Sequence, residues 1–272
     1  MADADADIMS DAGLARSRAL LEDSVREAGA LALSLFRTEL KNWVKGASSP
    51  VSEADIAVND LLENRLRSAT PDYGWLSEES ADDPARLAQR LVWVVDPIDG
   101  TRNYLAHKDD WCVSVALVAN GSPLLAAVFA PVTDEFFFAS RGHGASCNGV
   151  TIRTTSGTQL DFARVAGPKP LVERLKKTLG DITLHPRIGS LALRLCRVGD
   201  GKLDVAFVGG NSHDWDLAAA DLIVHEADGR LTGLSGDAIR YNRREVTHGV
   251  LMAAGRDRHA EIIEHFRHLP LP

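Results

Sequence analysis

One stretch of the sequence decides the fold of this chain, and it reads LVWVVDPIDGT, residues 91–101. Its first five residues are all apolar, which predicts a buried strand that ends at Asp96. A second carboxylate, Asp99, follows three residues later. Pro97 restrains one backbone angle and Gly100 frees another, so the chain can turn tightly here. Such a turn can aim both carboxylates at one point.

The atoms offered by this turn suit a magnesium ion and a phosphate. Carboxylates and the carbonyl oxygen of Ile98 are hard oxygen ligands, which magnesium prefers. Gly100 and Thr101 supply backbone N–H groups, and if Thr101 begins a helix, its positive end favours a phosphate. An aspartate that only caps a turn is the alternative for Asp96 or Asp99 alone. The complete six-residue string after a buried strand favours the metal site.

Further carboxylates elsewhere in the chain are candidates for the same site. Glu78 and Glu79 end a short apolar stretch, Asp216 precedes an apolar helical run, and Asp55 lies near the start of another helix. Each has a simpler explanation: a solvated acidic pair, an N-cap, or an acidic first turn. These residues become candidates only in the company of the string at 96–101.

Composition limits the class of protein. The chain has 272 residues, 38 of them acidic and 30 basic, for a formal net charge of −8. A net acidic protein is poorly suited to non-specific nucleic-acid binding, so we expect no nucleic-acid partner. Three cysteines lie far apart, which predicts neither a disulfide framework nor a zinc site. No signal peptide or membrane-spanning run is found, so we expect a cytoplasmic protein without membrane contact.

Periodicity divides the chain into a tail and two halves. Residues 1–13 are expected to be a disordered tail. Residues 14–150 form an N-terminal α+β half that carries most of the acidic candidates, and residues 151–272 form a C-terminal α/β half that supplies Asp216 and substrate contacts.

Within these halves the expected elements are as follows. Helices are predicted at 14–44 and 51–69, with a loop at 45–50, and an antiparallel meander at 111–119, 124–130 and 135–139. A glycine-rich segment at 141–149 closes the first half. In the second half we predict strands at 162–166, 203–208 and 250–254, and helices at 171–179, 191–198 and 217–227.

Three strings in this order resemble the inositol monophosphatase family of magnesium-dependent, lithium-sensitive phosphatases: Leu76-Ser77-Glu78-Glu79-Ser80, Asp96 to Thr101, and Trp215-Asp216-Leu217-Ala218. The likeness extends over residues 51–255 and includes Gly144-Ala145, Asn148-Gly149 and Gly189-Ser190. The resemblance implies a layered αβαβα sandwich of the inositol monophosphatase and fructose-bisphosphatase type, within the α/β (α+β) class. It also implies two or three Mg²⁺ ions, inhibition by Li⁺, and a homodimer.

The resemblance implies a metal role for each matching residue. Glu78, Asp96 and the carbonyl of Ile98 match the ligands of a first metal. Asp96, Asp99 and Asp216 match the ligands of a second. Two ions neutralise the attacking and leaving oxygens of a phosphate ester and lower the pKa of a bound water.

Other matching residues imply the remaining machinery. Asp55 and Thr101 match the pair that orients the attacking water, and Glu78 joins them among the catalytic residues. Gly100 and Thr101 match the phosphate cradle. Glu79 matches a neighbour of the ligand position, which does not bind the metal itself but orients the residues that do.

The substrate is less sharply defined. Inositol-selective members carry an acidic residue seven positions before Asp216, where this chain has Gly209. Residues 80–87, 100–102 and 109–111 resemble bacterial 3'(2'),5'-bisphosphate nucleotidases, which favours hydrolysis of adenosine 3',5'-bisphosphate to AMP. Arg102 can approach a second phosphate, or it can be a solvated helix residue. His213 lies close to the Trp-Asp string and can touch substrate, but a hydrogen bond at the entry of the helix is the simpler role. Further basic candidates, none of them singled out by the sequence, are Lys169, Arg187, Arg194, Arg240, Arg243 and Arg244.

Three alternatives remain open. The protein can be an inositol monophosphatase that hydrolyses inositol 1-phosphate, or a sugar-bisphosphatase with the same metal site. A non-enzymatic alternative is a regulatory protein that binds the transcription machinery, because a fold does not determine a function. The intact carboxylate set favours catalysis on a small-molecule phosphate ester.

Overall fold

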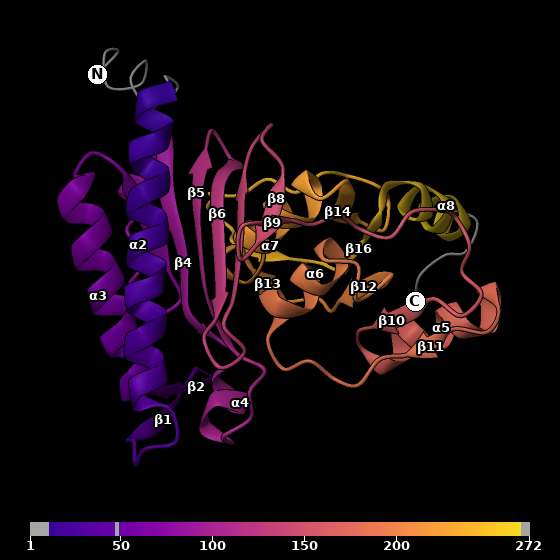
Figure 1. Ribbon diagram of the computed structural model, residues 1–272, viewed down its shortest axis with the longest axis horizontal. Coiled ribbons are helices and arrows are strands. Elements are labelled where there is room, and N and C mark those ends of the chain that lie inside the picture. The colour runs from indigo at the N-terminus through magenta and orange to yellow at the C-terminus, as the bar shows by residue number, and fades with distance from the viewer. Residues whose placement is uncertain (1–10, 47–48, 268–272) are drawn as a thin grey trace.

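The computed structural model describes residues 11–46 and 49–267. Helices and sheets alternate in five layers, with paired helices outside and between a seven-stranded and a five-stranded sheet (Figure 1). The layered sandwich expected from the sequence is therefore confirmed. No helix within the described residues has the length and apolar character needed to cross a membrane.

The first two layers come from the N-terminal half. Helices α2 (Asp11–Leu35) and α3 (Glu53–Ala69) pack on one face of the large sheet, with Val25 and Leu62 fully buried against it. The sheet has the strand order β3-β4-β5-β6-β7-β8-β9. Its strands are β3 (Gly74–Ser77), β4 (Leu91–Asp99), β5 (Cys112–Ala119), β6 (Ser122–Ala130), β7 (Glu135–Ser140), β8 (Ala145–Cys147) and β9 (Val150–Thr151).

The pairing within this sheet contains the expected meander. Strands β4 to β9 are each antiparallel to the next. Strand β3 is the exception, since it runs parallel to β4. The carboxyl ends of β3 and β4 therefore meet at one edge of the sheet.

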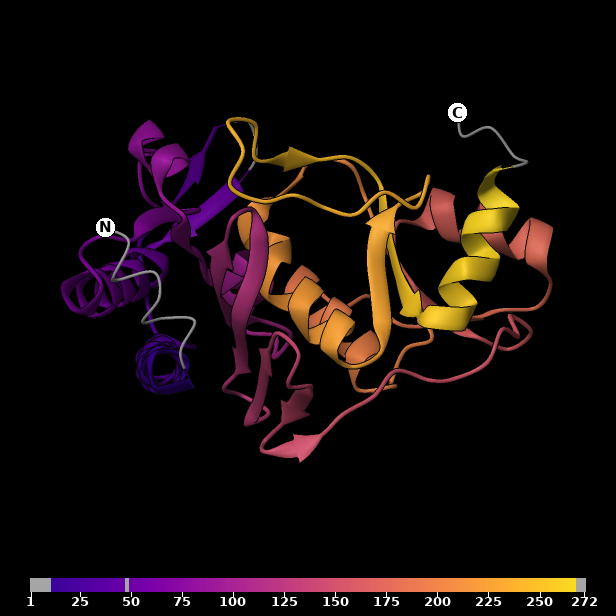
Figure 2. The same cartoon turned by 90° about the horizontal axis from the view of Figure 1, so that it is seen from above.

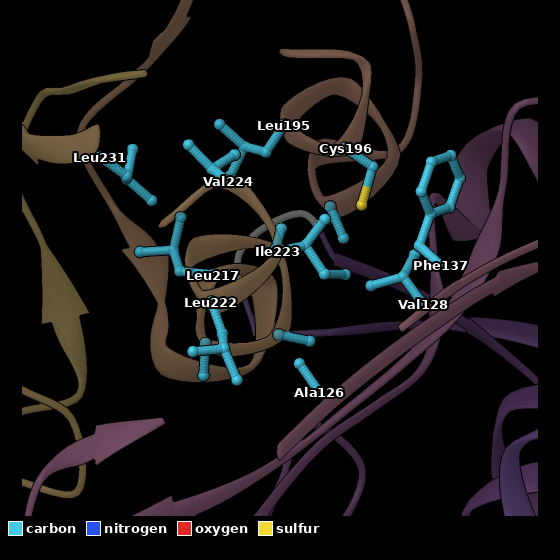
Figure 3. Packing of buried hydrophobic residues seen from close by; sticks show 14 of the residues in the cluster. Ala126, Val128, Phe137, Leu195, Cys196, Leu217, Leu222, Ile223, Val224 and Leu231 are labelled. Carbon is cyan, nitrogen blue, oxygen red and sulfur yellow. The ribbon is translucent and has the colours of Figure 1, made fainter. Parts of the chain in front are cut away.

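The central layer consists of α6 (Leu191–Gly199) and α7 (Asp214–Glu226). Helix α7 is apolar on nearly all sides because it packs on the large sheet, on α6 and on the second sheet. Leu217 and Ile223 lie among side chains from all these elements (Figure 3). Burial on every side explains why the run at 217–227 shows little amphipathic pattern. The division near residue 150 stays a prediction.

The last two layers come from the C-terminal half. The second sheet has the order β11-β10-β12-β16-β14, and helices α5 (Lys169–Leu179) and α8 (Arg256–Arg267) lie on its outer side (Figure 2). Its strands are β10 (Arg164–Ala166), β11 (Thr183–Leu184), β12 (Val205–Val208), β14 (Gly229–Gly233) and β16 (Leu251–Gly255). A small separate pair joins β13 (Ser212–His213) to β15 (Thr247–His248).

Three expectations at the start of the chain differ from the structure. Residues 1–10 of the expected tail lie outside the described residues, whereas Asp11–Gly13 already belong to α2. The helix predicted to residue 44 ends at Leu35, before Arg37 adopts a left-handed φ of 64°. The chain then forms a hairpin of β1 (Asn42–Lys45) and β2 (Ser49–Ser52) in place of the predicted loop.

Other boundaries also differ from the sequence expectation. Strand β4 continues through Pro97 to Asp99, with an irregular register between Asp96 and Asp99. Proline is tolerated there because a bulge needs no ladder N–H at that position. The glycine-rich segment contains β8 and extends the sheet, and β10 begins two residues later than predicted. The short helix η1 (Pro84–Ala88) was not predicted, whereas α4 (Thr101–Leu105) starts at the expected residue. The three cysteines are free.

Candidate active site

The parallel pairing of β3 and β4 brings the first two acidic segments together. Ser77 at the end of β3 lies opposite Val95, and the next N–H, that of Glu78, donates to the Val95 carbonyl at 3.2 Å. Glu78 is thus held beside Asp96, one residue further along β4. The carboxyl edge of a sheet is a common place for ligand sites in α/β proteins.

Asp96 is the most deeply placed carboxylate. It is 1% exposed, and its Oδ1 atom has no hydrogen-bond partner among the described residues. An unpaired buried carboxylate oxygen costs several kcal/mol unless a cation meets it. This orphaned oxygen fits a metal ligand.

Asp99 is held by the start of helix α6. Its Oδ2 atom accepts a 2.5 Å bond from the Ser190 hydroxyl and a 2.5 Å bond from the Ala192 backbone N–H. The same Ser190 hydroxyl accepts from Leu193 N–H at 3.0 Å and caps α6. The serine therefore couples the orientation of Asp99 to the position of the helix.

Asp216 reaches the same point from the C-terminal half. It stands in the first turn of α7 and accepts a 2.6 Å bond from the His213 backbone N–H. One carboxylate oxygen each of Asp96, Asp99 and Asp216 lies within 4.8 Å of the others. The triad spans two halves of the chain and two layers of the fold.

A second set of contacts surrounds Thr101. Its hydroxyl lies 3.0 Å from Asp55 Oδ1 and 3.0 Å from the Ile98 carbonyl oxygen. Asp55 is 2% exposed and also accepts from the Ser52 N–H at 2.8 Å and the Ser52 hydroxyl at 2.5 Å. These contacts fix the Asp55 carboxylate against the turn that carries Asp99.

The crowding of acids raises their pKa values. Burial, followed by the negative charges of Asp216, Glu79 and Asp99, raises the pKa of Glu78 to about 8. Burial and the Asp216 charge raise the pKa of Asp99 to about 6 against opposing hydrogen bonds, and burial raises the pKa of Asp96 well above its usual range. A bound divalent cation reverses this balance by favouring the ionised forms. The donor set is thus suited to magnesium.

Sequence reasoning missed two groups that hold this site. Lys45 projects from the β1–β2 hairpin, where its ammonium donates to the Glu78 carbonyl oxygen and lies 3.4 Å from Glu79 Oε2. The Lys45 charge opposes the effect of burial, which raises the pKa of Glu79. Ser190, the partner of Asp99, appeared in the sequence only as part of a Gly-Ser pair. Neither residue carried a local signal, because each reaches the acids across the fold.

The residues expected to bind phosphate and substrate lie in different parts of the structure. Gly100 has φ of 100°, and a Cβ there would lie 2.9 Å from the Asp110 carbonyl oxygen, so only glycine fits. Helix α4 begins at Thr101, as expected, and Arg102 is exposed on it. His213 is the N-cap of α7, and its ring stacks on Trp215 with centroids 4.7 Å apart.

Asp221 is a further acid on α7 outside the triad. Its carboxylate accepts a 2.8 Å hydrogen bond from the Tyr241 hydroxyl. Burial raises the pKa of Asp221 to about 7. Asp221 stands on α7 beyond Asp216, and Tyr241 reaches it from the segment between β14 and β15.

Comparisons with known proteins agree with this geometry. A profile of the inositol monophosphatase family matches residues 15–271. Inositol monophosphatase 2 of Solanum lycopersicum is 34% identical over 74% of this chain and 81% of its own length. Nus factor SuhB of Xylella fastidiosa is 38% identical over 68% of this chain and 69% of its own.

A solved structure shows the same fold. The extragenic suppressor protein SuhB of Bartonella henselae superposes with a TM-score of 0.79 and 25% identity, over 92% of this chain and 98% of that one. The acidic site and the family match together make this chain a magnesium-dependent phosphatase. The chain belongs to the inositol monophosphatase family.

Proposed function

We propose that this protein hydrolyses a small phosphate monoester at the acidic triad. The observation that carries the proposal is the meeting of Asp96, Asp99 and Asp216 within 4.8 Å, with the Oδ1 atom of Asp96 unpaired. Glu78 and the Ile98 carbonyl extend this donor set. We assign Glu78, Asp96 and Ile98 to a first Mg²⁺ ion and the three aspartates to a second.

Bound magnesium supplies charge neutralisation and an activated water. The chain's own residues then orient the reaction. The Thr101 hydroxyl, held between Asp55 and the Ile98 carbonyl, is placed to accept a hydrogen bond from the attacking water. Asp55 is placed to take its proton through Thr101, because its pKa is raised by burial despite the Ser52 hydrogen bonds. Glu79 pairs with Lys45, which also donates to the Glu78 carbonyl oxygen, and this pairing positions Glu78.

The turn after β4 is the proposed phosphate cradle. The first N–H groups of a helix have no intrahelical acceptor, so those of Gly100 and Thr101 can bind phosphate oxygens. A side chain at Gly100 would push against Asp110 and the Ser190 backbone. Arg102, exposed on α4, and His213, the N-cap of α7, are proposed as outer substrate contacts.

The identity of the ester is a choice between two substrates. Relatives named inositol monophosphatase favour inositol 1-phosphate. Gly209, in place of the acidic residue that grips an inositol hydroxyl, favours adenosine 3',5'-bisphosphate. Phosphate release by purified protein with magnesium, with and without lithium, tests both esters together with fructose 1,6-bisphosphate. Absence of magnesium-dependent release from every ester would contradict the proposed function.

A second candidate function rests on the relatives named Nus factor SuhB. It is a regulatory role at the transcription machinery, carried by the same fold. Affinity capture of RNA polymerase by the tagged protein, combined with no phosphate release, would favour it. Asp96→Asn protein separates the two functions, since it should lose turnover while any regulatory surface stays intact.

A further inference from the structure

A basic pocket lies at the start of helix α6, whose N-cap Ser190 holds Asp99 of the acidic triad. Its volume is about 490 Å³, which is within the range of small-molecule sites. It is formed by the end of β10, the start of α5, the segment before α6 and the first turn of α6. The polar side chains that line it are those of Lys169, His185, Arg187 and Arg194, and no acidic side chain lines it.

The wall of this pocket is continuous with the site of Asp99. Ser190, which donates to Asp99, is followed one helical turn later by Arg194, whose N–H donates to the Ser190 carbonyl at 3.2 Å. One α-helical turn rises about 5.4 Å. Gly189 packs so closely on Asn103 of α4 that a Cβ would overlap it. The start of α6 therefore links the Asp99 site to the basic pocket through one turn of helix.

The guanidinium group of Arg194 is not fully hydrogen-bonded. Its Nε atom is buried and has no hydrogen-bond partner among the described residues. Burial and the positive charge of Arg187 both lower the pKa of Arg194, while Asp99 acts in the other direction. A buried guanidinium N–H without an acceptor is costly. An anion between Arg187 and Arg194 would offset the repulsion between their positive charges.

The charge around the pocket supports the same occupant. The whole chain carries a net charge of −8, yet this pocket is lined by Lys169, Arg187, Arg194 and a histidine. Lys169 is partly neutralised by Glu173 at 3.6 Å, so the two arginines carry most of the positive charge. Gly209 adjoins it, since a Cβ at Gly209 would lie 3.4 Å from Pro168 Cγ. An acidic side chain at Gly209 would face the pocket and repel an anion, and glycine avoids this repulsion.

We infer that the pocket of Lys169, Arg187 and Arg194 binds a second anionic group of the substrate, so that the enzyme prefers phosphate esters that carry two anionic groups. This inference rests on the proposed function, because it places the scissile phosphate at the acidic triad. A nucleotide and a sugar can each present such a second phosphate, with the same chemistry.

Matched substrate pairs test the inference. The first pair is adenosine 3',5'-bisphosphate and adenosine 3'-phosphate, and the second is fructose 1,6-bisphosphate and fructose 1-phosphate. In one pair, we expect kcat/KM with magnesium to be at least ten-fold higher for the bisphosphate than for the monophosphate. The pair that shows this preference tells whether the substrate is a nucleotide or a sugar. The ratio should fall at least ten-fold in Arg187→Gln/Arg194→Gln protein. Arg153→Gln, an exposed arginine outside the pocket, should leave the ratio unchanged.

A binding measurement keeps the inference separate from catalysis. Calorimetric titration without magnesium compares the two members of each pair. The scissile phosphate is common to both members, and the metal-free acids repel the more highly charged bisphosphate at least as strongly, so tighter binding of the bisphosphate needs a separate anion site. Tighter binding of a bisphosphate by the wild type, lost in the double variant, would support the second anion site even if no ester were hydrolysed. Absence of hydrolysis would contradict only the proposed function. Equal binding and equal kcat/KM within both pairs would overturn the inference. The inference would also be overturned if kcat/KM fell by the same factor for the bisphosphate and the monophosphate in Arg187→Gln/Arg194→Gln protein. The two arginines would then affect the whole site and not a second anionic group.

Discussion

Asp96→Asn is expected to change stability and activity in opposite directions. The substitution removes one negative charge from a triad whose carboxylate oxygens lie within 4.8 Å of one another. Two unit charges at that distance repel by about 3.5 kcal/mol at an effective dielectric constant of about 20. Asparagine keeps the size of the side chain, and its amide can donate to a neighbouring carboxylate.

Part of this repulsion is already avoided by protonation, since burial and the neighbouring acids raise the pKa values of Asp96 itself, Asp99 and Glu78. At a pH near the Glu78 pKa of about 8, we expect the metal-free variant to be more stable by about 2 kcal/mol. For a chain of this size that corresponds to a Tm higher by roughly 4–8 °C. Magnesium should stabilise the wild type by ligand linkage and the variant much less.

Thermal unfolding with EDTA and with magnesium measures both effects, and phosphate release measures turnover. Asp60→Asn, an exposed aspartate on α3, is the matched control and should change neither. Near-normal turnover by Asp96→Asn would refute the ligand assignment. A metal-free variant less stable than the wild type would refute the reasoning about charge repulsion.

Three other substitutions test the surrounding structure. Gly100→Ala should lower the free energy of unfolding in urea by about 1–3 kcal/mol, because φ is 100° there; an unchanged value would contradict the steric argument. Ser190→Ala removes the hydroxyl that orients Asp99, so magnesium affinity measured by titration should fall about 10- to 100-fold. Unaltered affinity would contradict the positioning role of Ser190. Burial raises the pKa of Asp221 from the ordinary 3.8 to about 7, so the folded state holds this proton more tightly. Stability should therefore decrease as pH rises between these values, by roughly 4 kcal/mol at most, and Asp221→Asn should remove that slope in chemical denaturation.

The acidic string at 96–101 determined much of this protein without any structure. A buried apolar run followed by two carboxylates, a proline and a glycine has few other uses, so the string predicted the strand, the turn and the metal chemistry together. The antiparallel meander and most helices were also local in origin, since hydrophobic period and turn residues act within one element. Boundaries failed where pairing overrode local preference, as at the hairpin of β1 and β2 and at the bulge that carries β4 through Pro97.

Only the tertiary structure decided which residues surround the acids. Asp216 meets Asp96 because α7 is buried between two sheets, and no local pattern encodes that depth. Lys45 and Ser190 reach the acids from a hairpin and from the start of a helix, over long separations in sequence. Arg194 looked like any other arginine until packing left its Nε buried beside a pocket. Local propensity specifies elements, whereas burial, charge and hydrogen-bond partners depend on contacts that form only when the layers stack.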